Sequence, residues 1–281
     1  MLGPKNPAVH ELRRLLSSRR HRREQQRFAI EGPELLIAAL DAGWVVERAF
    51  VDPERVSNLE IGRARSLAQR SGVAVDELAP GVLEKVADAA TPQGCAAIVV
   101  GAPGPLAELG TAHFVVVLDT IQDPGNLGAV VRVAEAAGAD ALVLTGSSAD
   151  PFGPKALRGS TGSSFRMPIF EHPSARVALE DLKGRGLAVA LTSPHDGVDF
   201  AAVAWPDSVA LVLGNEANGL DAELIAAGDL VVTIPMAPGV ESLNLSVSAG
   251  ILAMGVARDL RARRGVRRGS TIAGMETEGH R

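Results

Sequence analysis

The stretches LVLGNEANGL (residues 211–220) and VVTIPMAPGVESLNLSVSAG (residues 231–250) decide how this chain folds. Two apolar runs, residues 209–213 and 230–234, have the length of buried strands, and each ends in a polar loop that contains glycine or proline. The second loop leads into a helix of small residues that begins near Ser246. Ligands of open α/β sheets bind at the carboxyl ends of the strands. These two loops are therefore the first candidate for a binding site.

The composition is that of a soluble globular protein. The chain has 281 residues, of which 46% are hydrophobic, enough for one large domain or two smaller ones. No apolar run approaches the roughly 18 to 20 residues that a membrane span needs. The first residues, MLGPKNPAVHELRRLL, also lack the apolar core of a signal peptide. We therefore expect a cytoplasmic protein.

The chain has a single cysteine, Cys95, so it forms no intrachain disulfide, which suits a reducing compartment. Cys95 precedes the apolar run AAIVV and has no histidine near it in the sequence, so packing is a better interpretation than a nucleophile. The six histidines are scattered without ligand spacing. No zinc or iron site is expected.

The charges are unevenly distributed along the chain. Residues 1–30 carry eight basic and two acidic side chains (8 − 2 = +6), and residues 258–281 carry seven arginines and three acids (7 − 3 = +4). The formal net charge is −5, so the middle of the chain carries −5 − 10 = −15. Basic ends on an acidic body indicate contact with a polyanion. Solvated arginine-rich ends are the alternative.

Residues 1–100 are predicted to form a small α/β unit. We expect helices over residues 8–26, from Pro33, and over 59–70 and 80–87, and strands near 28–31, 45–51, 73–75 and 95–100. The helix over 8–26 has an arginine-rich face. The segment GAPGPLAELG (residues 101–110) has two prolines and three glycines, which disfavour regular structure. It is the expected linker between two domains.

Residues 111–264 alternate strand and helix as a parallel sheet requires. The expected strands are 113–118, 141–144, 167–170, 187–191, 209–213 and 230–234, and the expected helices are 126–137, 154–157, 175–183 and 246–263, with a short acidic helix between the last two strands. Residues 265–281 lack apolar periodicity and are predicted to be a disordered tail.

Polar side chains follow the first strand of this second unit, in VVVLDTIQDPGNLGAVVRVAEAAGA (residues 115–139). A Pro-Gly turn precedes a helix that begins near Asn126 and carries Arg132 about two turns later. The turn has no GxGxxG fingerprint, so it is not a dinucleotide site. By spacing alone, the favoured interpretation is that Asn126 is a helix N-cap and Arg132 a surface partner of Glu135.

Two further segments have functional potential. DPFGPKALRGSTGSSFRMP (residues 150–168) offers backbone amides, hydroxyls and the cations Lys155, Arg158 and Arg166, which suit phosphate contacts, although an ordinary Ser/Gly loop has the same composition. The stretch quoted first presents Glu216 between two glycines, and alternates polar Ser242 and Asn244 with apolar residues. The same alternation occurs at any half-buried strand end.

Together, DPGNLGAVVR, LGNEANGL and IPMAPGVESLNLSVSAG resemble the three motifs of the SpoU (TrmH) class of RNA ribose 2′-O-methyltransferases, within the SPOUT superfamily. The resemblance covers residues 107–262. Residues 1–100, with FAIEGPELL as the most similar segment, resemble more weakly the L30e-like RNA-recognition domain of that class. The implied fold is α/β, with a small L30e-like domain followed by a C-terminal trefoil-knotted SPOUT methyltransferase domain that contains a parallel sheet and works as a homodimer.

The resemblance also implies a reaction and a set of site residues. The implied reaction transfers a methyl group from S-adenosyl-L-methionine to a ribose 2′-hydroxyl. The polar positions around the transferred methyl group are Asn126, Arg132, Glu216, Ser242 and Asn244, and the cofactor positions are Leu191, Thr192, Gly214, Asn215, Ile234, Met236 and Leu243. The class casts the equivalent of Arg132 as the activating group. A guanidinium has a pKa above about 12 and no acceptor, so a free arginine is a very weak general base at neutral pH. The alternative is that Arg132 grips the neighbouring phosphate and stabilises the developing alkoxide as a cation.

RNA is the expected partner, as rRNA or tRNA. Aromatic residues make up 3% of the chain and tyrosine is absent, so an aromatic stacking platform is not expected. The expected RNA contacts are cations: Arg13, Arg14, Arg19, Arg20, Arg22, Arg23, Lys155 and Arg158. The two-domain organisation favours 23S rRNA over tRNA, in either a housekeeping or a resistance role. A non-catalytic RNA-binding factor on the same fold is the alternative, and the absence of GxxxxGK[ST] disfavours a nucleotide-dependent enzyme.

Overall fold

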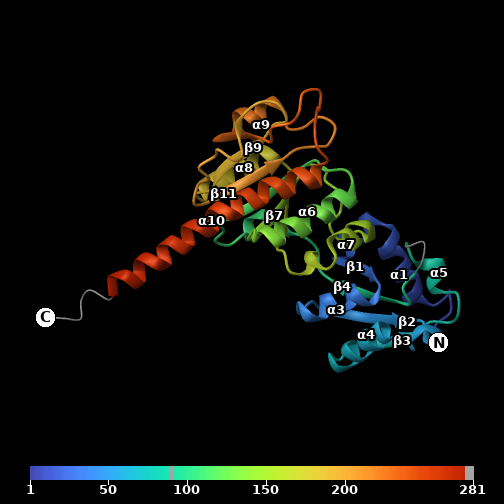
Figure 1. The fold of residues 1–281 in the computed structure, drawn as a ribbon. Helices are drawn as coiled ribbons and strands as arrows, with labels where there is room; N and C mark the ends of the chain where they lie inside the picture. The colour runs from blue at the N-terminus through green and yellow to red at the C-terminus, as the bar shows by residue number, and fades with distance from the viewer. Residues whose placement is uncertain (89–91, 276–281) are drawn as a thin grey trace. The chain divides into compact units, whose positions relative to one another are not determined.

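The computed structural model describes residues 1–88 and 92–275, with side chains up to residue 263. The chain forms two compact units, in which unit 1 comprises Met1–Pro105, Ile121–Arg132 and Ser148–Ile169. Unit 2 comprises Leu106–Thr120, Val133–Ser147 and the chain from Phe170 onward (Figure 1). Compact packing therefore assigns two segments that follow the expected linker, residues 121–132 and 148–169, to unit 1, whereas the sequence suggested a single division within residues 101–110.

Unit 1 is built on a four-stranded mixed sheet of order β1-β4-β2-β3. β4 (Cys95–Val100) is antiparallel to β1 (Arg27–Glu31) and to β2 (Val46–Val51), and β3 (Ala74–Glu77) is parallel to β2. The helices of this unit are α1 (Pro7–Ser17), α2 (Arg19–Gln25), α3 (Pro33–Asp41), α4 (Leu59–Arg70), α5 (Leu83–Val86) and α7 (Pro154–Ser160), with 3-10 turns at Pro53–Arg55 and Ser163–Phe165.

Alternating residues of β1 enter two different hydrophobic clusters, as the period of two along a strand requires. Phe28 packs with Leu36, Phe152 and Phe165, whereas Ala29 packs with apolar residues of α1. The ring centroids of Phe28 and Phe152 lie 4.5 Å apart. Trp44 Nε1 donates to the carbonyl oxygen of Phe165 at 2.9 Å. These aromatic contacts explain why residues 148–169 belong to unit 1.

The single helix predicted over residues 8–26 is two helices that meet at Ser18. The Ser18 N–H donates to the carbonyl of Arg14, ending α1, and the Ser18 hydroxyl accepts from the N–H of His21, starting α2. A serine side chain can replace a backbone partner in this way, so it favours helix ends over helix interiors. The sequence pattern does not reveal this break, because the residues on both sides of Ser18 form one continuous Arg-rich run.

The second sheet has eight strands in the order β10-β12-β9-β11-β6-β7-β8-β5. The pairs β10/β12, β12/β9, β9/β11, β11/β6 and β6/β7 are all parallel. The strands are β5 (Gly104–Pro105), β6 (Phe114–Asp119), β7 (Ala141–Thr145), β8 (Ile169–His172), β9 (Ala188–Thr192), β10 (Val198–Asp199), β11 (Val209–Leu213) and β12 (Leu230–Thr233). All five residues of β11 are buried, as expected for a parallel strand covered on both faces.

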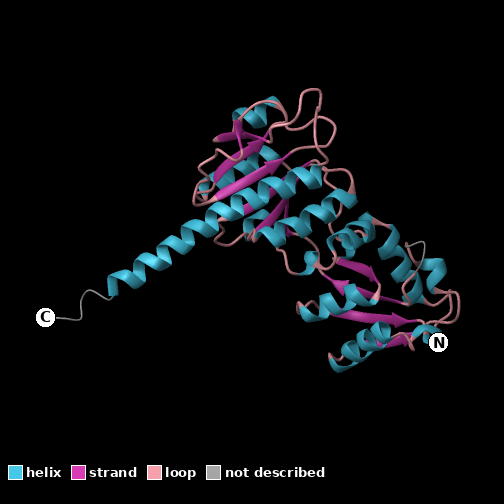
Figure 2. Ribbon diagram, in the orientation of Figure 1, coloured by secondary structure: helices cyan, strands magenta, loops and turns pink. Residues whose placement is uncertain are grey.

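Helices follow most of these strands along the chain, but β9, β10 and β11 succeed one another without a helix between them. Figure 2 shows the helices in cyan and the strands in magenta. These helices are α6 (Pro124–Ala137), α8 (Ala175–Gly184), α9 (Ala222–Ala226) and α10 (Leu245–Met275). The core of unit 2 includes Val117, Val143, Leu182, Val189 and Val212. The α/β class with a parallel sheet in the second half therefore agrees with the prediction.

α10 continues to Met275, so its last residues lie in the segment predicted to be a disordered tail, residues 265–281. The disorder of that tail stays a prediction. Arginine, alanine and methionine are good helix formers, and extending an existing helix needs no new nucleation. Residues 276–281 of the predicted tail lie outside the described residues. In the part of the chain that is described, no helix is long and apolar enough to cross a membrane.

Candidate functional site

The predicted cofactor residues of unit 2 lie at one edge of the sheet. β12, β9 and β11 are neighbours, with Leu191 of β9 paired to Val231 on one side and to Val212 on the other. Because the three strands are parallel, their carboxyl ends meet at the same edge. This edge holds Leu191 and Thr192 at the end of β9, Gly214, Asn215 and Glu216 after β11, and Ile234 and Met236 after β12.

The loop after β11 requires glycine at position 214. A Cβ on Gly214 would lie 2.5 Å from the Leu220 nitrogen and would also clash with the Gly219 backbone. The side chain of Asn215 organises this turn, since its Oδ1 accepts from the N–H groups of Ala217 (2.9 Å) and Asn218 (3.3 Å). Its Nδ2 donates to the carbonyl of Thr120 at 2.8 Å. The loop is therefore built by its own hydrogen bonds, and Glu216 is exposed on it.

The segment before α10 is a loop, although its alternation also suited a strand end. Asn244 caps α10, because its Oδ1 accepts from the Ser246 N–H at 2.9 Å and from the Ser246 hydroxyl at 2.6 Å. Ser242, Leu243 and Asn244 are exposed. The capping role of Asn244 was not predicted, although an Asn shortly before a run of small residues is a recognisable helix start.

Asn126 and Arg132 lie on the part of α6 that belongs to unit 1. The N-terminus of α6 is capped by Asp123, whose Oδ1 accepts from the Asn126 N–H at 2.9 Å. Lys155 Nζ lies 2.6 Å from Asp123 Oδ2. This hydrogen bond, with those from the backbone, lowers the pKa of Asp123. The alternative interpretation of Asn126 as the N-cap is therefore wrong by three residues, and Asp123 takes that role.

The exposed side chain of Arg132 contacts α7, with Nη1 3.5 Å from the Thr161 hydroxyl. α6 and α7 are close at this crossing, since a Cβ on Gly128 would clash with the Ala156 carbonyl and lie 2.9 Å from the Ser160 nitrogen. Asn126 and Arg132 thus belong to unit 1, whereas Glu216, Ser242 and Asn244 belong to unit 2. Convergence of these five residues on one substrate stays a prediction.

The basic residues predicted to bind RNA differ in their surroundings. Arg13, Arg14, Arg20 and Arg23 are exposed, and Arg19 is half-buried. Arg158 pairs with Glu31 and Asp88, and Lys155 pairs with Asp123, so both cations have acidic partners inside unit 1.

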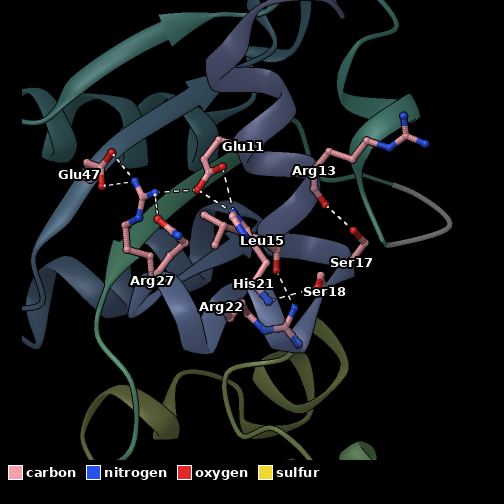
Figure 3. Close-up of polar contacts among 10 residues, drawn as sticks. Glu11, Arg13, Leu15, Ser17, Ser18, His21, Arg22, Arg27 and Glu47 are labelled. Carbon is pink, nitrogen blue, oxygen red and sulfur yellow. Dashed lines mark hydrogen bonds and ion pairs between the residues drawn. The ribbon is translucent and has the colours of Figure 1, made fainter.

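Arg22 is wrongly placed in the RNA-binding set, because it is buried. Its Nε donates to Asp150 Oδ2 at 2.7 Å and its Nη1 to the Leu15 carbonyl at 2.6 Å. A charge so enclosed is a structural partner, not a phosphate ligand. Figure 3 shows Arg22 directed at Leu15, and beside it a second network in which Glu11 accepts from His21 and Arg27. Helical spacing could not separate Arg22 from its exposed neighbours.

Cys95 is buried in β4, as its apolar neighbours predict. Burial raises the pKa of its thiol to about 12, so almost no thiolate exists at neutral pH. This environment suits a packing residue. Among the described residues, no group of three or more His, Cys, Asp or Glu side chains is arranged to hold a metal ion.

Comparisons with known proteins agree with this architecture. Residues 113–254 match the SpoU rRNA Methylase family, and residues 6–97 match the MRM3-like substrate binding domain. A 23S rRNA (guanosine(2553)-2′-O)-methyltransferase of Bacillus subtilis is 35% identical over 252 residues, covering 88% of this chain and 95% of the relative. A 23S rRNA (uridine(2479)-2′-O)-methyltransferase of Streptomyces viridochromogenes is 29% identical, covering 87% of each chain. The crystal structure of an AdoMet-bound rRNA methyltransferase from Sinorhizobium meliloti superimposes with a TM-score of 0.78 at 30% identity, covering 91% of this chain and 95% of the other.

Proposed function

This chain belongs to the SpoU rRNA methylase family, and on that premise we propose that its substrate is a ribose of 23S rRNA. It is an S-adenosylmethionine-dependent rRNA ribose 2′-O-methyltransferase, of the EC 2.1.1 class. The choice of 23S rRNA is supported by the names of two relatives that share most of the chain, from Bacillus subtilis and Streptomyces viridochromogenes. Membership of an enzyme family disfavours the alternative of a non-catalytic RNA-binding factor.

The observation that carries the site proposal is the shared sheet edge of β12, β9 and β11. The residues present fit S-adenosylmethionine: Gly214 has no side chain and lets the cofactor approach the backbone, and Ile234 and Leu243 offer apolar surface for the adenosine. The side chain of Leu191 is buried in the core, so its backbone is the part proposed to contact the cofactor. Thr192, Asn215 and Met236 are the remaining residues of the proposed cofactor site. The cofactor supplies an activated methyl group bound to a sulfonium.

The substrate side of the site has to align and activate the ribose. A bond forms between the 2′-oxygen and the methyl carbon while the carbon–sulfur bond breaks, and the 2′-hydroxyl loses its proton. Positioning the oxygen in line supplies a large part of such a rate enhancement. Arg132 stabilises the oxygen as it gains negative charge and grips the neighbouring phosphate. Asn126, Glu216, Ser242 and Asn244 are the proposed polar contacts to the ribose, with Glu216 the strongest proton acceptor among them.

Arg132 variants test this role with 23S rRNA from a strain that lacks the enzyme. Arg132→Ala should abolish methyl transfer while S-adenosylmethionine still binds in isothermal titration, because the proposed cofactor residues lie in unit 2. Arg132→Lys should lose most activity, since a lysine cannot form the two-pronged phosphate contact of a guanidinium. Substantial retained activity in Arg132→Lys, with a pH profile that follows the lysine, would refute the proposed role of the guanidinium fork.

The proposed RNA contacts in unit 1 are the arginines of α1 and α2 other than Arg22: Arg13, Arg14, Arg19, Arg20 and Arg23. Deleting residues 1–26 is not a clean test, because Val9, Leu12, Leu15 and Leu16 of α1 are part of a buried cluster. Substituting the exposed arginines singly with glutamine preserves that cluster. Each substitution should weaken RNA binding and reduce its salt dependence.

A homodimer through α10 is proposed as well. Val247 and Met254 are exposed apolar residues seven positions apart, so they lie on one face of the helix. An exposed apolar stripe of this kind suits a subunit contact. The knotted topology and a cytoplasmic location are further parts of the proposal that come from the family.

A further inference from the structure

Three described residues other than glycine adopt left-handed backbone angles: Gln26, Thr120 and Thr161. Glycine occupies thirteen other positions with positive φ in the described chain. A β-branched residue is rare in this conformation, because its Cβ substituents crowd the backbone. A threonine at such a position points to a function of its side chain or its backbone direction.

Thr161 ends α7, with φ 50° and ψ 48°. Its N–H donates to the Arg158 carbonyl at 3.3 Å, a helix-ending hydrogen bond that glycine would make with less strain. The hydroxyl, which glycine lacks, lies 3.5 Å from Arg132 Nη1. Hydrogen bonds of catalytic groups are often long before substrate binds, and they shorten in the reactive complex.

The backbone around this pair is closely packed. A Cβ on Gly128 would clash with the Ala156 carbonyl, and a Cβ on Gly159 would lie 3.3 Å from the Gly125 carbonyl. The two helices therefore touch through their backbones, and this fixes the separation between α6, which carries Arg132, and the end of α7, which carries Thr161. The Asp123–Lys155 pair also joins α6 to α7.

A second strained threonine also contacts a predicted site residue. Thr120 has φ 56°, and its carbonyl accepts from Asn215 Nδ2 at 2.8 Å, within unit 2. Each left-handed threonine is thus in contact with a residue of the proposed site. Gln26, the third residue, lies in unit 1, where its Nε2 donates to the carbonyl of Arg23 at 2.9 Å.

We infer that Thr161 is a positioning residue, whose hydroxyl orients the guanidinium of Arg132 toward the ribose and its phosphate. An arginine side chain has many rotamers, and holding it in one of them before the substrate binds reduces the cost of ordering it in the transition state. The left-handed backbone places the hydroxyl on the side of α7 that meets α6. This inference rests on the proposed role of Arg132.

The variant Thr161→Gly distinguishes an effect on the orientation of Arg132 from an effect on the stability of the protein. Glycine relieves the backbone strain, so Tm should equal or exceed that of the wild type. The loss of the hydroxyl should lower kcat at least about tenfold, within the coupling range of contacting residues, with KM for undermethylated 23S rRNA nearly unchanged. Thr161→Ser, which keeps the hydroxyl, should restore kcat to within about threefold of the wild type. If Thr161 had a purely structural role, Thr161→Gly would lower kcat and Tm together.

Gln26→Gly is the matched control, because it relieves the same kind of strain at a residue that has no proposed role in orienting Arg132. It should leave kcat unchanged without lowering Tm. In an Arg132→Lys background, Thr161→Gly should have little further effect on kcat, because the guanidinium that Thr161 orients is no longer present. If Thr161→Gly keeps the wild-type kcat while Arg132→Ala is inactive, the inference about Thr161 is wrong and the proposed role of Arg132 stands. If Arg132→Ala is itself active, the proposed role of Arg132 is wrong, and the inference about Thr161 that rests on it is wrong too.

Discussion

Arg22→Met is expected to destabilise unit 1 without changing the electrostatics of RNA binding. The side chains of Arg22 and Asp150 are 9% and 13% exposed, and Nε and Oδ2 are 2.7 Å apart. The substitution leaves the Asp150 carboxylate and the Leu15 carbonyl without the guanidinium that donates to both. Removing one partner of a buried pair costs about 3–5 kcal/mol. For a chain of this size that is a fall in Tm of roughly 6–20 °C.

The assay combines chemical denaturation with RNA binding at several salt concentrations. Arg22→Met should lower the free energy of unfolding while the slope of log K against log salt stays at the wild-type value. Arg13→Gln is the matched control: its stability should change by less than about 0.5 kcal/mol, and its slope should become shallower by about 0.7–0.9 for each phosphate that the protein no longer neutralises. The double variant Arg22→Met/Asp150→Leu should recover part of the stability, because neither charge of the buried pair remains. A shallower slope in Arg22→Met with unchanged stability would show that Arg22 binds RNA.

Three further predictions concern the site, the cysteine and the subunit contact. Gly214→Ala should abolish S-adenosylmethionine binding in isothermal titration, because its Cβ clashes with the backbone at Gly219 and Leu220, whereas Gly110→Ala, with open space around it, should bind normally. Cys95 should resist iodoacetamide at pH 8 in the native protein and react on unfolding, because a thiol with a pKa of about 12 is almost wholly protonated at pH 8; rapid native labelling would contradict the burial. Met254→Glu should convert a dimer to a monomer in analytical ultracentrifugation, and a wild type that is monomeric at micromolar concentration would contradict the proposed dimer.

The regular elements were predictable where the apolar pattern is strong. β4 and β11 begin and end at the predicted residues, 95–100 and 209–213, because both are continuous apolar runs between turn residues. α4 also has its predicted bounds, since Asn58 caps it and a glycine follows its end at Gly72. Patterns of this kind are local, so they can be recognised without tertiary information.

What the sequence did not reveal depends on long-range contacts. Phe152 and Phe165 read as parts of a polar loop, yet they complete the aromatic cluster around Phe28, more than a hundred residues away. Arg22 belongs to the same Arg-rich run as Arg20 and Arg23, and only its ion pair with Asp150 distinguishes it. The functional motifs could be recognised in the sequence because each of them is one unbroken stretch of residues. The side chains that support them, such as those of Thr161 beside Arg132 and Lys155 beside Asp123, come from other segments.

The central claim is that this protein methylates a ribose 2′-hydroxyl of 23S rRNA. It is tested most directly by mapping ribose methylation across total RNA from a deletion strain, its parent, and the deletion strain complemented with wild type or Gly214→Ala. The account predicts that one 23S rRNA 2′-O-methyl group is lost on deletion, restored by the wild type and not by Gly214→Ala. An unchanged 23S rRNA pattern, or a lost methyl group confined to tRNA, would contradict it.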